Sequence, residues 1–438
     1  MKRLTLLSLL IPVFSFGQWS IDSMSVARCF AGSISHKEKV YIAGGNTNFN
    51  PDQTTNRIDI YDHATASWSM DSLSLSRADV AVGAMGNQIM FAGGIDGSGN
   101  AVNRVEILDL GTNTWTIDSL PRAQGAGVIL AHKGKFYIGG GTSPTSSGVT
   151  NLVSIYDTLT QTWSIDSLSI GRFGLAGASW GDFLAFAGGY TNTSTYPSTD
   201  VVDIYNSATG QWSTAQLTEG RGNINGIEHG GKFYFAGGLR SVNTGALSKK
   251  VDVFEPATST WTSFELSRGR RSIAIAALDE LIFFAGGEQS FSGNISSKVL
   301  DIYDTQLDSL YADELSTGRD AAMAQSVGNK VFIAGSCRYS NNTFKKSIDV
   351  YTKYGLGLSS EQGNELVVYP NPSQGMVNFK GPLKGKRLVV YNAQGLLVWD
   401  AELNGNKLNL KPWGTGVYSV LIKENEEIIQ HLRIMVLD

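Results

Sequence analysis

Short segments in which hydrophobic and polar residues alternate recur along most of the chain. An apolar run that ends in two glycines, such as YIAGG at 41–45, is followed by a polar loop, an alternating segment such as RIDIYD, and a tryptophan. Period-two alternation, β-branched residues and intervening turn residues are typical of β-strands. The pattern therefore predicts a chain built from short strands.

The glycine pairs repeat at nearly constant intervals. Successive spacings are 49, 47, 48, 49, 49 and 49 residues, a period that marks a repeat architecture. The pairs begin at Gly44, Gly93, Gly140, Gly188, Gly237 and Gly286, with a degenerate copy at Gly335-Ser336. Arginines recur at similar intervals, at Arg28, Arg77, Arg122, Arg172, Arg221, Arg270 and Arg319. Tryptophans do so at Trp19, Trp68, Trp115, Trp163, Trp212 and Trp261, with Leu310 in the seventh position.

Each unit predicts four strands, and the first of them, after the arginine, is rich in small residues. The double glycine, the Tyr-Asp and the following Trp resemble the kelch repeat over residues 19–353. This resemblance implies a β-propeller of four-stranded blades. A Trp segment precedes the first glycine pair, and the last unit lacks one. We therefore expect an all-β, seven-bladed kelch propeller closed by an N-terminal outer strand.

The two cysteines fall near the expected closure. Cys29 begins the first inner strand, and Cys337 follows the last double-glycine position. These strand ends share a face, and the first and last blades are neighbours, so a disulfide between them is geometrically reasonable. Two free thiols are the alternative.

Both ends of the chain predict export. Residues 1–17 combine a basic start at Lys2 and Arg3 with an apolar stretch and small residues before a cleavage point, as a secretory signal peptide does. A retained membrane anchor is the alternative. No other segment predicts a transmembrane helix in the mature chain. We expect the propeller at 18–353, a linker at 354–363 and a small β-sandwich at 364–438.

The sandwich resembles the type A C-terminal sorting domain of the type IX secretion system. The residues that carry the resemblance are Tyr369, Pro370, Asn371, Pro372 and Gly375, then Gly395, then Gly416 and Tyr418. It implies export through the periplasm, recognition by the secretion machinery, and a mature protein that is attached to the cell surface or released. An ordinary carbohydrate-binding sandwich is the alternative.

Charge and histidine spacing exclude several functions. The 35 basic and 39 acidic residues give a net charge of −4 without a long run of one sign, which disfavours nucleic acid as a partner. The five histidines show no metal-binding spacing, so we expect no metal and no cofactor. The copper-radical oxidases among kelch propellers need copper-binding histidines that this chain does not place together.

Ligand-binding candidates lie on the expected face of the loops between the second and third strands. The seven repeated arginines, with Arg271 as an eighth charge, could grip an anionic ligand bidentately near the channel mouth. The alternative is a structural role within each blade. The loops are rich in Asn, Ser and Thr and contain Tyr190, Tyr196 and Tyr339, which suits glycan or protein recognition but also ordinary solvated loops.

An Asp-Ser pair follows several tryptophans and could be structural or modified. An Asx-type turn is the structural interpretation. The pair also resembles the Asp-Ser/Thr-apolar acceptor for bacterial O-glycosylation. That pattern occurs at Ser23, Ser72, Ser119, Thr158, Ser167 and Ser309.

The sequence favours a monomeric, non-catalytic surface or secreted protein that binds glycan or protein. One alternative is a carbohydrate-active enzyme resembling epimerases or mutarotases, which needs an acid and a base to converge. Its candidate residues on the inner strands are Asp79, Asp320 and Glu228. A structural surface-layer protein is the third interpretation.

Overall fold

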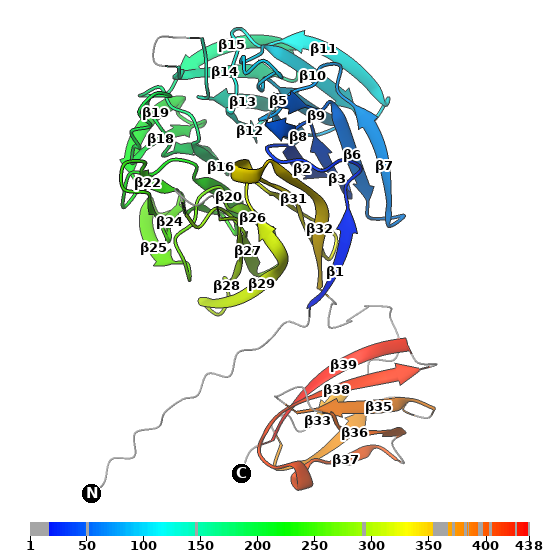
Figure 1. The fold of residues 1–438 in the computed structure, drawn as a ribbon. Coiled ribbons are helices and arrows are strands. Elements are labelled where there is room, and N and C mark those ends of the chain that lie inside the picture. Colours follow the sequence, from blue (N-terminus) through cyan, green and yellow to red (C-terminus); the bar gives the residue numbers. More distant parts are fainter. Residues whose placement is uncertain are drawn as a thin grey trace, which may run out of the picture. The chain divides into compact units, whose positions relative to one another are not determined.

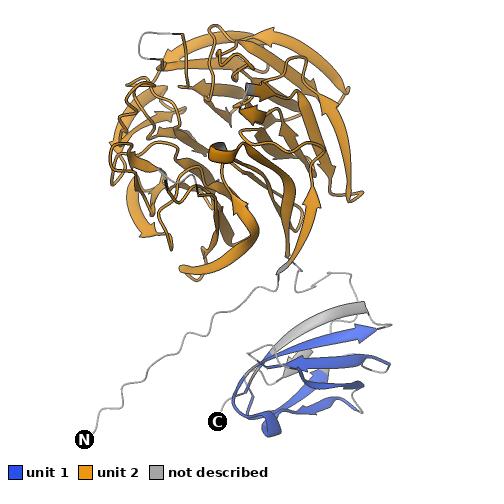
Figure 2. Ribbon diagram, in the orientation of Figure 1, with its two compact units in different colours: residues 1–17, 353–438 blue, residues 18–352 orange. Residues whose placement is uncertain are grey.

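A computed structural model describes residues 17–49, 52–144, 148–290, 295–353, 367–369, 373–380, 383, 385–392, 397–402, 405–424 and 427–436. The predicted linker and, apart from Gly17, the predicted signal peptide lie outside these residues. Two compact units are present, one covering residues 18–352 and the other including residues 353–438 (Figure 2). Within the described residues, no helical segment has the length and apolar character needed to cross a membrane.

Seven four-stranded antiparallel sheets surround a central axis in the described part of residues 17–353 (Figure 1). We call these sheets blades 1–7. Blade 1 contains β2 (Gly32–His36), β3 (Lys39–Ala43), β6 (Arg57–Asp62) and β7 (Ser67–Ser72). Blade 2 contains β8 (Ala81–Met85), β9 (Gln88–Ala92), β10 (Arg104–Asp109) and β11 (Thr114–Ser119). Blade 3 contains β12 (Val128–His132), β13 (Lys135–Gly139), β14 (Leu152–Asp157) and β15 (Thr162–Ser167).

The remaining blades follow the same order. Blade 4 contains β16 (Ala176–Trp180), β17 (Phe183–Ala187), β18 (Val201–Asn206) and β19 (Gln211–Gln216). Blade 5 contains β20 (Asn225–His229), β21 (Lys232–Ala236), β24 (Lys250–Glu255) and β25 (Thr260–Glu265). Blade 6 contains β26 (Ala274–Leu278), β27 (Leu281–Ala285), β28 (Ser297–Asp304) and β29 (Ser309–Arg319). Two short hairpins, β4 (Asn46–Phe49) with β5 (Asp52–Thr54) and β22 (Leu239–Ser241) with β23 (Ala246–Leu247), lie in the loops.

The two ends of the propeller build blade 7 together. It contains β30 (Met323–Val327), β31 (Lys330–Arg338) and β32 (Thr343–Lys353) from one end and β1 (Gly17–Ser23) from the other. The inner strands contact one another in a closed cycle from β2 through β8, β12, β16, β20 and β26 to β30, which contacts β2 again. The inner strands thus form a closed ring, which blade 7 completes.

The double glycines join each blade to the next. The second glycine of a pair donates its N–H to the carbonyl of the next blade's arginine, as Gly189 does to Arg221 O at 2.9 Å. A Cβ on the first glycine, Gly188, would lie 2.7 Å from the same oxygen, and Gly188 has a φ of 62°. Glycine is therefore required at this position for the approach of the next backbone and for the left-handed conformation.

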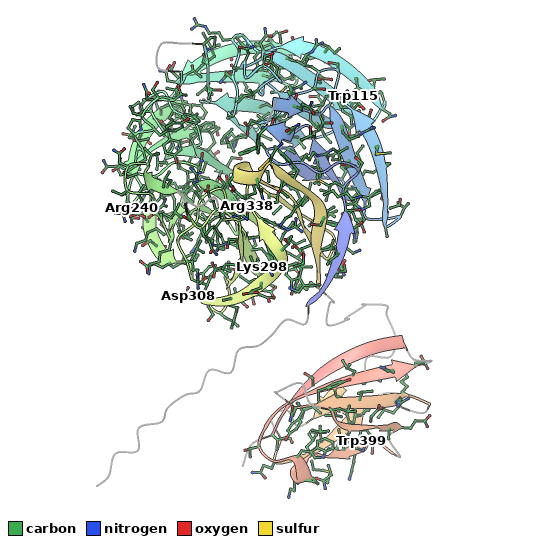
Figure 3. The ribbon with its side chains drawn as sticks, viewed as in Figure 1. Trp115, Arg240, Lys298, Asp308, Arg338 and Trp399 are labelled. Atoms are coloured by element: carbon green, nitrogen blue, oxygen red, sulfur yellow. A yellow bond between two sulfur atoms is a disulfide. The ribbon has the colours of Figure 1, made fainter. Side chains whose placement is uncertain are left out.

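Tryptophan and aspartate form a second link between blades at the outer rim, where Trp115 lies (Figure 3). The Trp163 indole N–H donates to Asp118 Oδ2 of the preceding blade at 2.8 Å. The other oxygen of Asp118 accepts the N–H of Ser119 at 2.7 Å. Asp118 thus accepts the backbone N–H of the residue that follows it and also bridges two blades. Equivalent bridges join Trp68 to Asp22, Trp115 to Asp71, Trp212 to Asp166 and Trp19 to Asp313.

The boundaries between blades 4 and 5 and between blades 5 and 6 lack this bridge. The first of them allows a test of how much the bridge stabilises the fold. Trp261 faces blade 4, where Ala215 replaces the aspartate. We predict that Ala215→Asp raises the free energy of unfolding by about 0.5–1 kcal/mol, and that Asp118→Ala lowers it by about 1–2 kcal/mol. Urea unfolding followed by tryptophan fluorescence measures both effects. Equal midpoints for Asp118→Ala and the unmodified chain would contradict a stabilising bridge.

The C-terminal unit contains two sheets with a common hydrophobic core. One sheet has the order β33 (Val367–Tyr369), β34 (Met376–Lys380), β37 (Lys407–Asn409). The other has the order β36 (Leu397–Glu402), β35 (Arg387–Tyr391), β38 (Gly416–Glu424), β39 (Glu427–Val436). Buried residues of both sheets, among them Phe379, Val390 and Val420, form one cluster. A short 3-10 turn, η2 (Lys411–Trp413), precedes β38.

Candidate functional site

Six of the predicted ligand-binding arginines are buried inside their own blades. Their side chains are 0% exposed, and each pairs with a carboxylate on the third strand of the same blade. The prediction that they form a ligand-binding ring is therefore wrong for these six, because no guanidinium atom reaches the surface. The pairs are Arg28–Asp59, Arg77–Glu106, Arg172–Asp203, Arg221–Asp252, Arg270–Asp301 and Arg319–Asp349.

Each pair, which we call the arginine clasp, holds three parts of a blade together. Arg172 Nη2 lies 2.6 Å from Asp203 Oδ2 and donates to the carbonyl of Phe186 on the second strand at 3.0 Å. Asp203 Oδ1 accepts the N–H of Ser169 at 3.0 Å, in the segment that arrives from the preceding blade. Burial lowers the pKa of Arg172, and the charge of Asp203 opposes this shift. The clasp is thus structural.

Blade 3 replaces the clasp by a neutral pair, and Arg122 is not part of it. Arg122 is exposed, and Gln124 occupies the buried position instead. Gln124 Nε2 donates to the carbonyl of Gly140 at 2.9 Å, and its Oε1 accepts the hydroxyl of Ser154 at 2.6 Å. The assignment of Arg122 to the repeated series is therefore corrected to Gln124, and Ser154 stands where other blades have a carboxylate.

A ring of residues in the left-handed conformation surrounds the axis just before the inner strands. Their φ angles lie between 46° and 61°. Backbone hydrogen bonds link neighbours, as from Asp79 N–H to Phe30 O at 2.8 Å and from Ser272 N–H to Asn223 O at 3.1 Å. We call the set the axial ring, and its members are Phe30, Asp79, Ala126, Gly174, Asn223, Ser272 and Ala321.

Next to the axial ring, two positions in each blade face each other across a backbone bridge. One follows the clasp residue, and the other follows the double glycine. In blades 2, 3 and 5 both residues are uncharged, as in the Ala78–Ile95, Gly125–Thr142 and Gly222–Leu239 bridges. Blade 4 has Phe173 and Tyr190, and blade 6 has Arg271 and Glu288. The chemistry of this face therefore differs from blade to blade at fixed repeat positions.

Blades 4, 6 and 7 bring polar side chains together near the axis. We call this group the axial cluster; it consists of Tyr190 from blade 4, Arg271 and Glu288 from blade 6, and Asp320 from blade 7. Arg271 Nε lies 2.6 Å from Glu288 Oε2, and its Nη2 lies 2.5 Å from the same oxygen. Tyr190, from blade 4, reaches past blade 5 because Gly222 has no side chain there: a Cβ would lie 2.5 Å from the Tyr190 ring. Burial raises the pKa of Tyr190 to about 12, while nearby Arg271 lowers it. Sequence reasoning selected Arg271 and Tyr190 but missed Glu288.

Two of the three predicted acid–base residues lie at this end of the propeller. Burial raises the pKa of Asp79 to about 7. Burial and the neighbouring Glu288 raise the pKa of Asp320 to about 7, while Arg271 acts in the opposite direction. Glu228 is at the far end of its inner strand, where it accepts the N–H of Gly231 at 2.9 Å. The three candidates therefore do not converge, and Glu228 is excluded from this site.

The raised pKa of Asp79 predicts a pH-dependent stability. The folded state holds the proton more tightly than the unfolded chain, so Asp79 favours the fold below pH 4 and loses that contribution as pH rises toward 7. We predict that Asp79→Asn leaves stability unchanged at pH 4 and raises it by about 2 kcal/mol at pH 8, allowing for partial solvent access. Thermal unfolding at both pH values measures the difference. An Asp79→Asn gain that is equal at pH 4 and pH 8 would contradict the raised pKa.

An aromatic group adjoins the axial cluster in the loop face. The ring centroids of Tyr190 and Tyr196 are 5.5 Å apart, and Phe173 lies 5.4 Å from Tyr190 and 5.8 Å from Tyr196. Tyr190 is 1% exposed, whereas Tyr196 is 40% exposed. Tyr196 is thus the part of this group that a ligand can reach. Tyr339 belongs to the turn η1 (Tyr339–Asn341), and its side chain lies outside the described residues.

Two of the histidines at the ends of inner strands make contacts between blades. His36 Nε2 lies 2.8 Å from the carbonyl of Gly86, and His132 Nε2 lies 3.0 Å from Ser207 Oγ. Burial lowers the pKa of His132. Among the residues that the structure describes, no group of three or more His, Cys, Asp or Glu could hold a metal ion.

The six Asp-Ser/Thr sites differ in the accessibility of their hydroxyl groups. Four serines are exposed at the ends of outer strands: Ser23, Ser72, Ser119 and Ser167. Thr158 is half-buried, and its hydroxyl donates to the carbonyl of Gly134 at 2.7 Å. Ser309 is half-buried, and its hydroxyl donates to the carbonyl of Leu307 at 3.0 Å.

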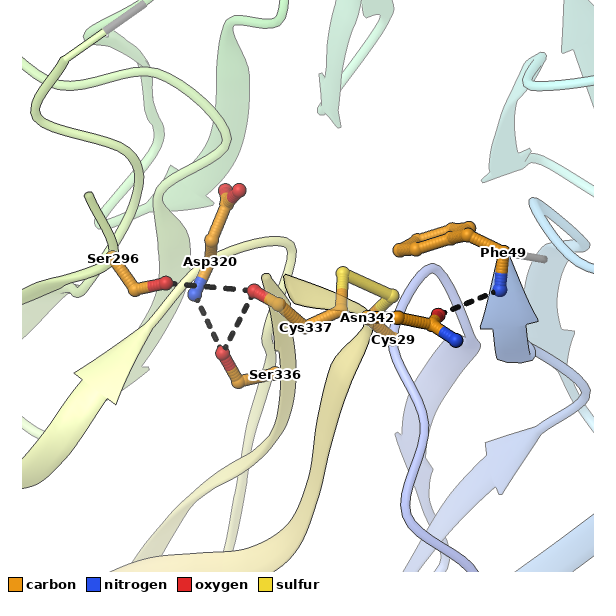
Figure 4. Close-up of a disulfide and its surroundings, with 7 residues drawn as sticks. All are labelled: Cys29, Phe49, Ser296, Asp320, Ser336, Cys337 and Asn342. Carbon is orange, nitrogen blue, oxygen red and sulfur yellow. Dashed lines mark hydrogen bonds between the residues drawn. A yellow bond between two sulfur atoms is a disulfide. The ribbon is translucent and has the colours of Figure 1, made fainter. Parts of the chain in front are cut away.

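A disulfide joins Cys29 to Cys337 across the closure between blades 1 and 7 (Figure 4). The two Cα atoms are 5.5 Å apart, and 308 positions separate the residues in sequence. Asn342 Oδ1 accepts the N–H of Phe49 beside the disulfide at 2.9 Å. Figure 4 also shows the Asp320 carboxyl pointing away from its own N–H, which donates to Ser336 Oγ at 2.9 Å.

In the C-terminal unit, part of the predicted sorting motif is described. The Tyr418 hydroxyl is 2.5 Å from the carbonyl of Trp413 and 2.9 Å from that of Gly414. Gly375 has a φ of 92°, and a Cβ there would lie 2.3 Å from Lys411 Cγ. Gly416 begins β38. Pro370, Asn371, Pro372 and Gly395, together with the side chain of Tyr369, lie outside the described residues.

Comparisons with known proteins agree with the repeats and with the fold. The kelch motif model matches residues 27–70 and 76–117. The solved structure of YjhT is similar, with a TM-score of 0.50 and 17% sequence identity over 67% of this chain and 99% of that chain, a likeness that concerns the fold alone. No curated protein matches the chain. The protein is therefore an all-β kelch-repeat β-propeller protein.

The comparison for the second unit concerns export of the protein. The model of the secretion system C-terminal sorting domain matches residues 367–436. The chain is thus a secreted kelch-repeat protein with a type IX sorting domain, and this domain implies contact with the secretion machinery and export to the cell surface or beyond.

Proposed function

We propose that the protein binds an extracellular glycan through the loop face of the propeller, around the axial cluster. The observation that supports this most is the meeting of Tyr190, Arg271 and Asp320 from three different blades, beside the exposed ring of Tyr196. An accessible aromatic ring next to polar groups that accept and donate hydrogen bonds suits a sugar, whose apolar face stacks and whose hydroxyls bond. A protein partner on the same loops is the alternative outcome.

A glycan array with two matched variants tests this function. Tyr196→Ala removes the exposed ring on the loop face. Trp180→Ala removes a ring that is 55% exposed at the opposite ends of the inner strands. We expect Tyr196→Ala to weaken the best array signal about tenfold and Trp180→Ala to leave it unchanged. The reverse result would move the binding site to the other face. A blank array together with capture of a surface protein would favour protein adhesion.

A carbohydrate-active enzyme is a second candidate, because the pKa values of Asp79 and Asp320 are both near 7. A carboxyl group with a pKa near the working pH can both give and take a proton, as epimerisation or mutarotation needs. NMR exchange spectroscopy on a sugar selected by the array tests it. Catalysed exchange that Asp320→Asn abolishes would establish this activity, and exchange at the uncatalysed rate would leave a binding function.

We also propose how the exported chain is processed. Cleavage after Gly17 would leave Gln18 as the first residue and retain β1 in blade 7. The sorting domain would be removed from the mature propeller, and the four exposed serines Ser23, Ser72, Ser119 and Ser167 would accept O-linked sugars. Intact-mass and glycopeptide mass spectrometry of the secreted protein measures all three. Bare serines at all four sites would contradict the modification.

A further inference from the structure

The axial cluster contains a buried acceptor that its own neighbours leave unused. Glu288 is 2% exposed, and both contacts from Arg271 go to its Oε2. Its Oε1 is buried and has no hydrogen-bond partner among the described residues. A buried carboxylate oxygen without a donor is unfavourable by about 1–3 kcal/mol, so a donor that reaches this oxygen stabilises it.

Carboxyl groups outnumber positive charges around Oε1. Arg271 supplies one positive charge, whereas Glu288 and Asp320 are two carboxyl groups; burial and the charge of Glu288 raise the pKa of Asp320. A positively charged donor would stabilise the ionised forms of Glu288 and Asp320, whereas an anionic ligand would meet repulsion from Glu288.

The aromatic side of the cluster favours the same kind of ligand. The buried ring of Tyr190 lies between the Arg271–Glu288 pair and the exposed Tyr196. Tyr196 is the ring that a ligand can reach, and a cation close to the face of a tyrosine ring gains further attraction. Carboxylates on one side and a ring on the other are the surroundings that an organic ammonium group prefers.

Building on the proposed function, we propose that the axial cluster selects sugars that carry a free amino group. The ammonium group of such an amino sugar would donate to Glu288 Oε1 and to the carboxylate of Asp320. The sugar ring would lie against Tyr196. Arg271 holds Glu288 in place through Oε2 and so acts as a positioning residue.

Three related sugars test the inference on the full propeller by NMR titration at pH 7: glucosamine, N-acetylglucosamine and glucuronate. They share a six-membered ring and differ in charge. We expect glucosamine to bind at least about tenfold more tightly than N-acetylglucosamine, because one charge-assisted hydrogen bond contributes about that factor. Equal affinities, or tighter binding of glucuronate, would overturn the inference and would instead make Arg271 the anchor.

Variants separate this site from unspecific attraction. Asp320→Asn and Glu288→Gln should each weaken glucosamine binding about tenfold while N-acetylglucosamine binding stays the same. Asp182→Asn, which changes an exposed carboxylate at the far ends of the inner strands, is the matched control and should have no effect. Should Glu288→Gln fail to fold, Asp320→Asn alone decides the outcome. Equal loss with Asp182→Asn would indicate a general charge effect and contradict the site.

The test also distinguishes the inference from the function on which it rests. A positive glycan array that Tyr196→Ala abolishes, combined with no preference for glucosamine, would refute the amine and leave glycan binding in place. No binding on the array and no binding of any of the three sugars would refute both the proposed glycan binding and the preference for an amino group.

Discussion

Replacing Asp203 with asparagine is expected to lower the free energy of unfolding by about 3–5 kcal/mol. Arg172 is 0% exposed and lies 2.6 Å from the Asp203 carboxylate, so the variant leaves a guanidinium charge inside blade 4 without its counter-ion. The variant also weakens the bond to the N–H of Ser169, which fixes the segment entering the blade. Urea unfolding followed by tryptophan fluorescence measures the loss.

The chain itself supplies the control for this prediction. Blade 3 holds the same positions with the neutral pair Gln124 and Ser154. The double variant Arg172→Gln with Asp203→Ser copies that pair into blade 4. It should lose no more than about 1–2 kcal/mol, because no charge is left buried. A double variant as unstable as Asp203→Asn would show that the loss does not come from the uncompensated charge.

The periodic part of the fold could be predicted from the sequence because a repeated residue makes the same contact in most blades. The second glycine of a pair donates its N–H to the carbonyl of the next arginine, and the arginines meet a carboxylate two strands away. Such contacts force the same residue type at the same spacing. The error at Arg122 had a detectable signal: the glycine pairs at 93 and 140 are 47 residues apart, but Arg77 and Arg122 are only 45 apart.

A second signal pointed to the same correction. The third strand of blade 3 reads LVSIYD, with Ser154 where RIDIYD and VVDIYN have aspartate. A buried arginine without a carboxylate is unfavourable, so the missing acid predicts a neutral partner. The two positions change together because one charge cannot stay buried without the other.

The candidate site was less accessible to sequence reasoning because it depends on positions that do not repeat. Arg271 and Glu288 occupy the positions that hold Gly222 and Leu239 in blade 5. Repetition marks residues that hold a blade together, whereas a ligand needs different groups from different blades at one place. Only the ring geometry shows that Tyr190 crosses over Gly222 toward Arg271. The positions that indicate the site are therefore those that vary between repeats, directly after the repeated arginine and after the glycine pair.

Reduction of the disulfide is the second large effect that we expect. The bond between Cys29 and Cys337 closes a loop of 308 positions, so it restricts the unfolded chain strongly. Cys29→Ser with Cys337→Ser should lower the free energy of unfolding by about 2–5 kcal/mol. The reduced wild-type chain should unfold at the same urea concentration as this double variant, and adding reductant to the variant should change nothing.

The folded ring should survive this loss, because other contacts also join blades 1 and 7. Ser336 N–H donates to Arg28 O at 3.2 Å, Met24 N–H donates to Lys346 O at 2.8 Å, and β1 completes blade 7. The near- and far-ultraviolet circular dichroism of the double variant should therefore match the wild-type spectra at low urea. An unchanged unfolding midpoint would show that these contacts alone hold the ring closed, and an unfolded variant would show that they cannot hold it without the disulfide.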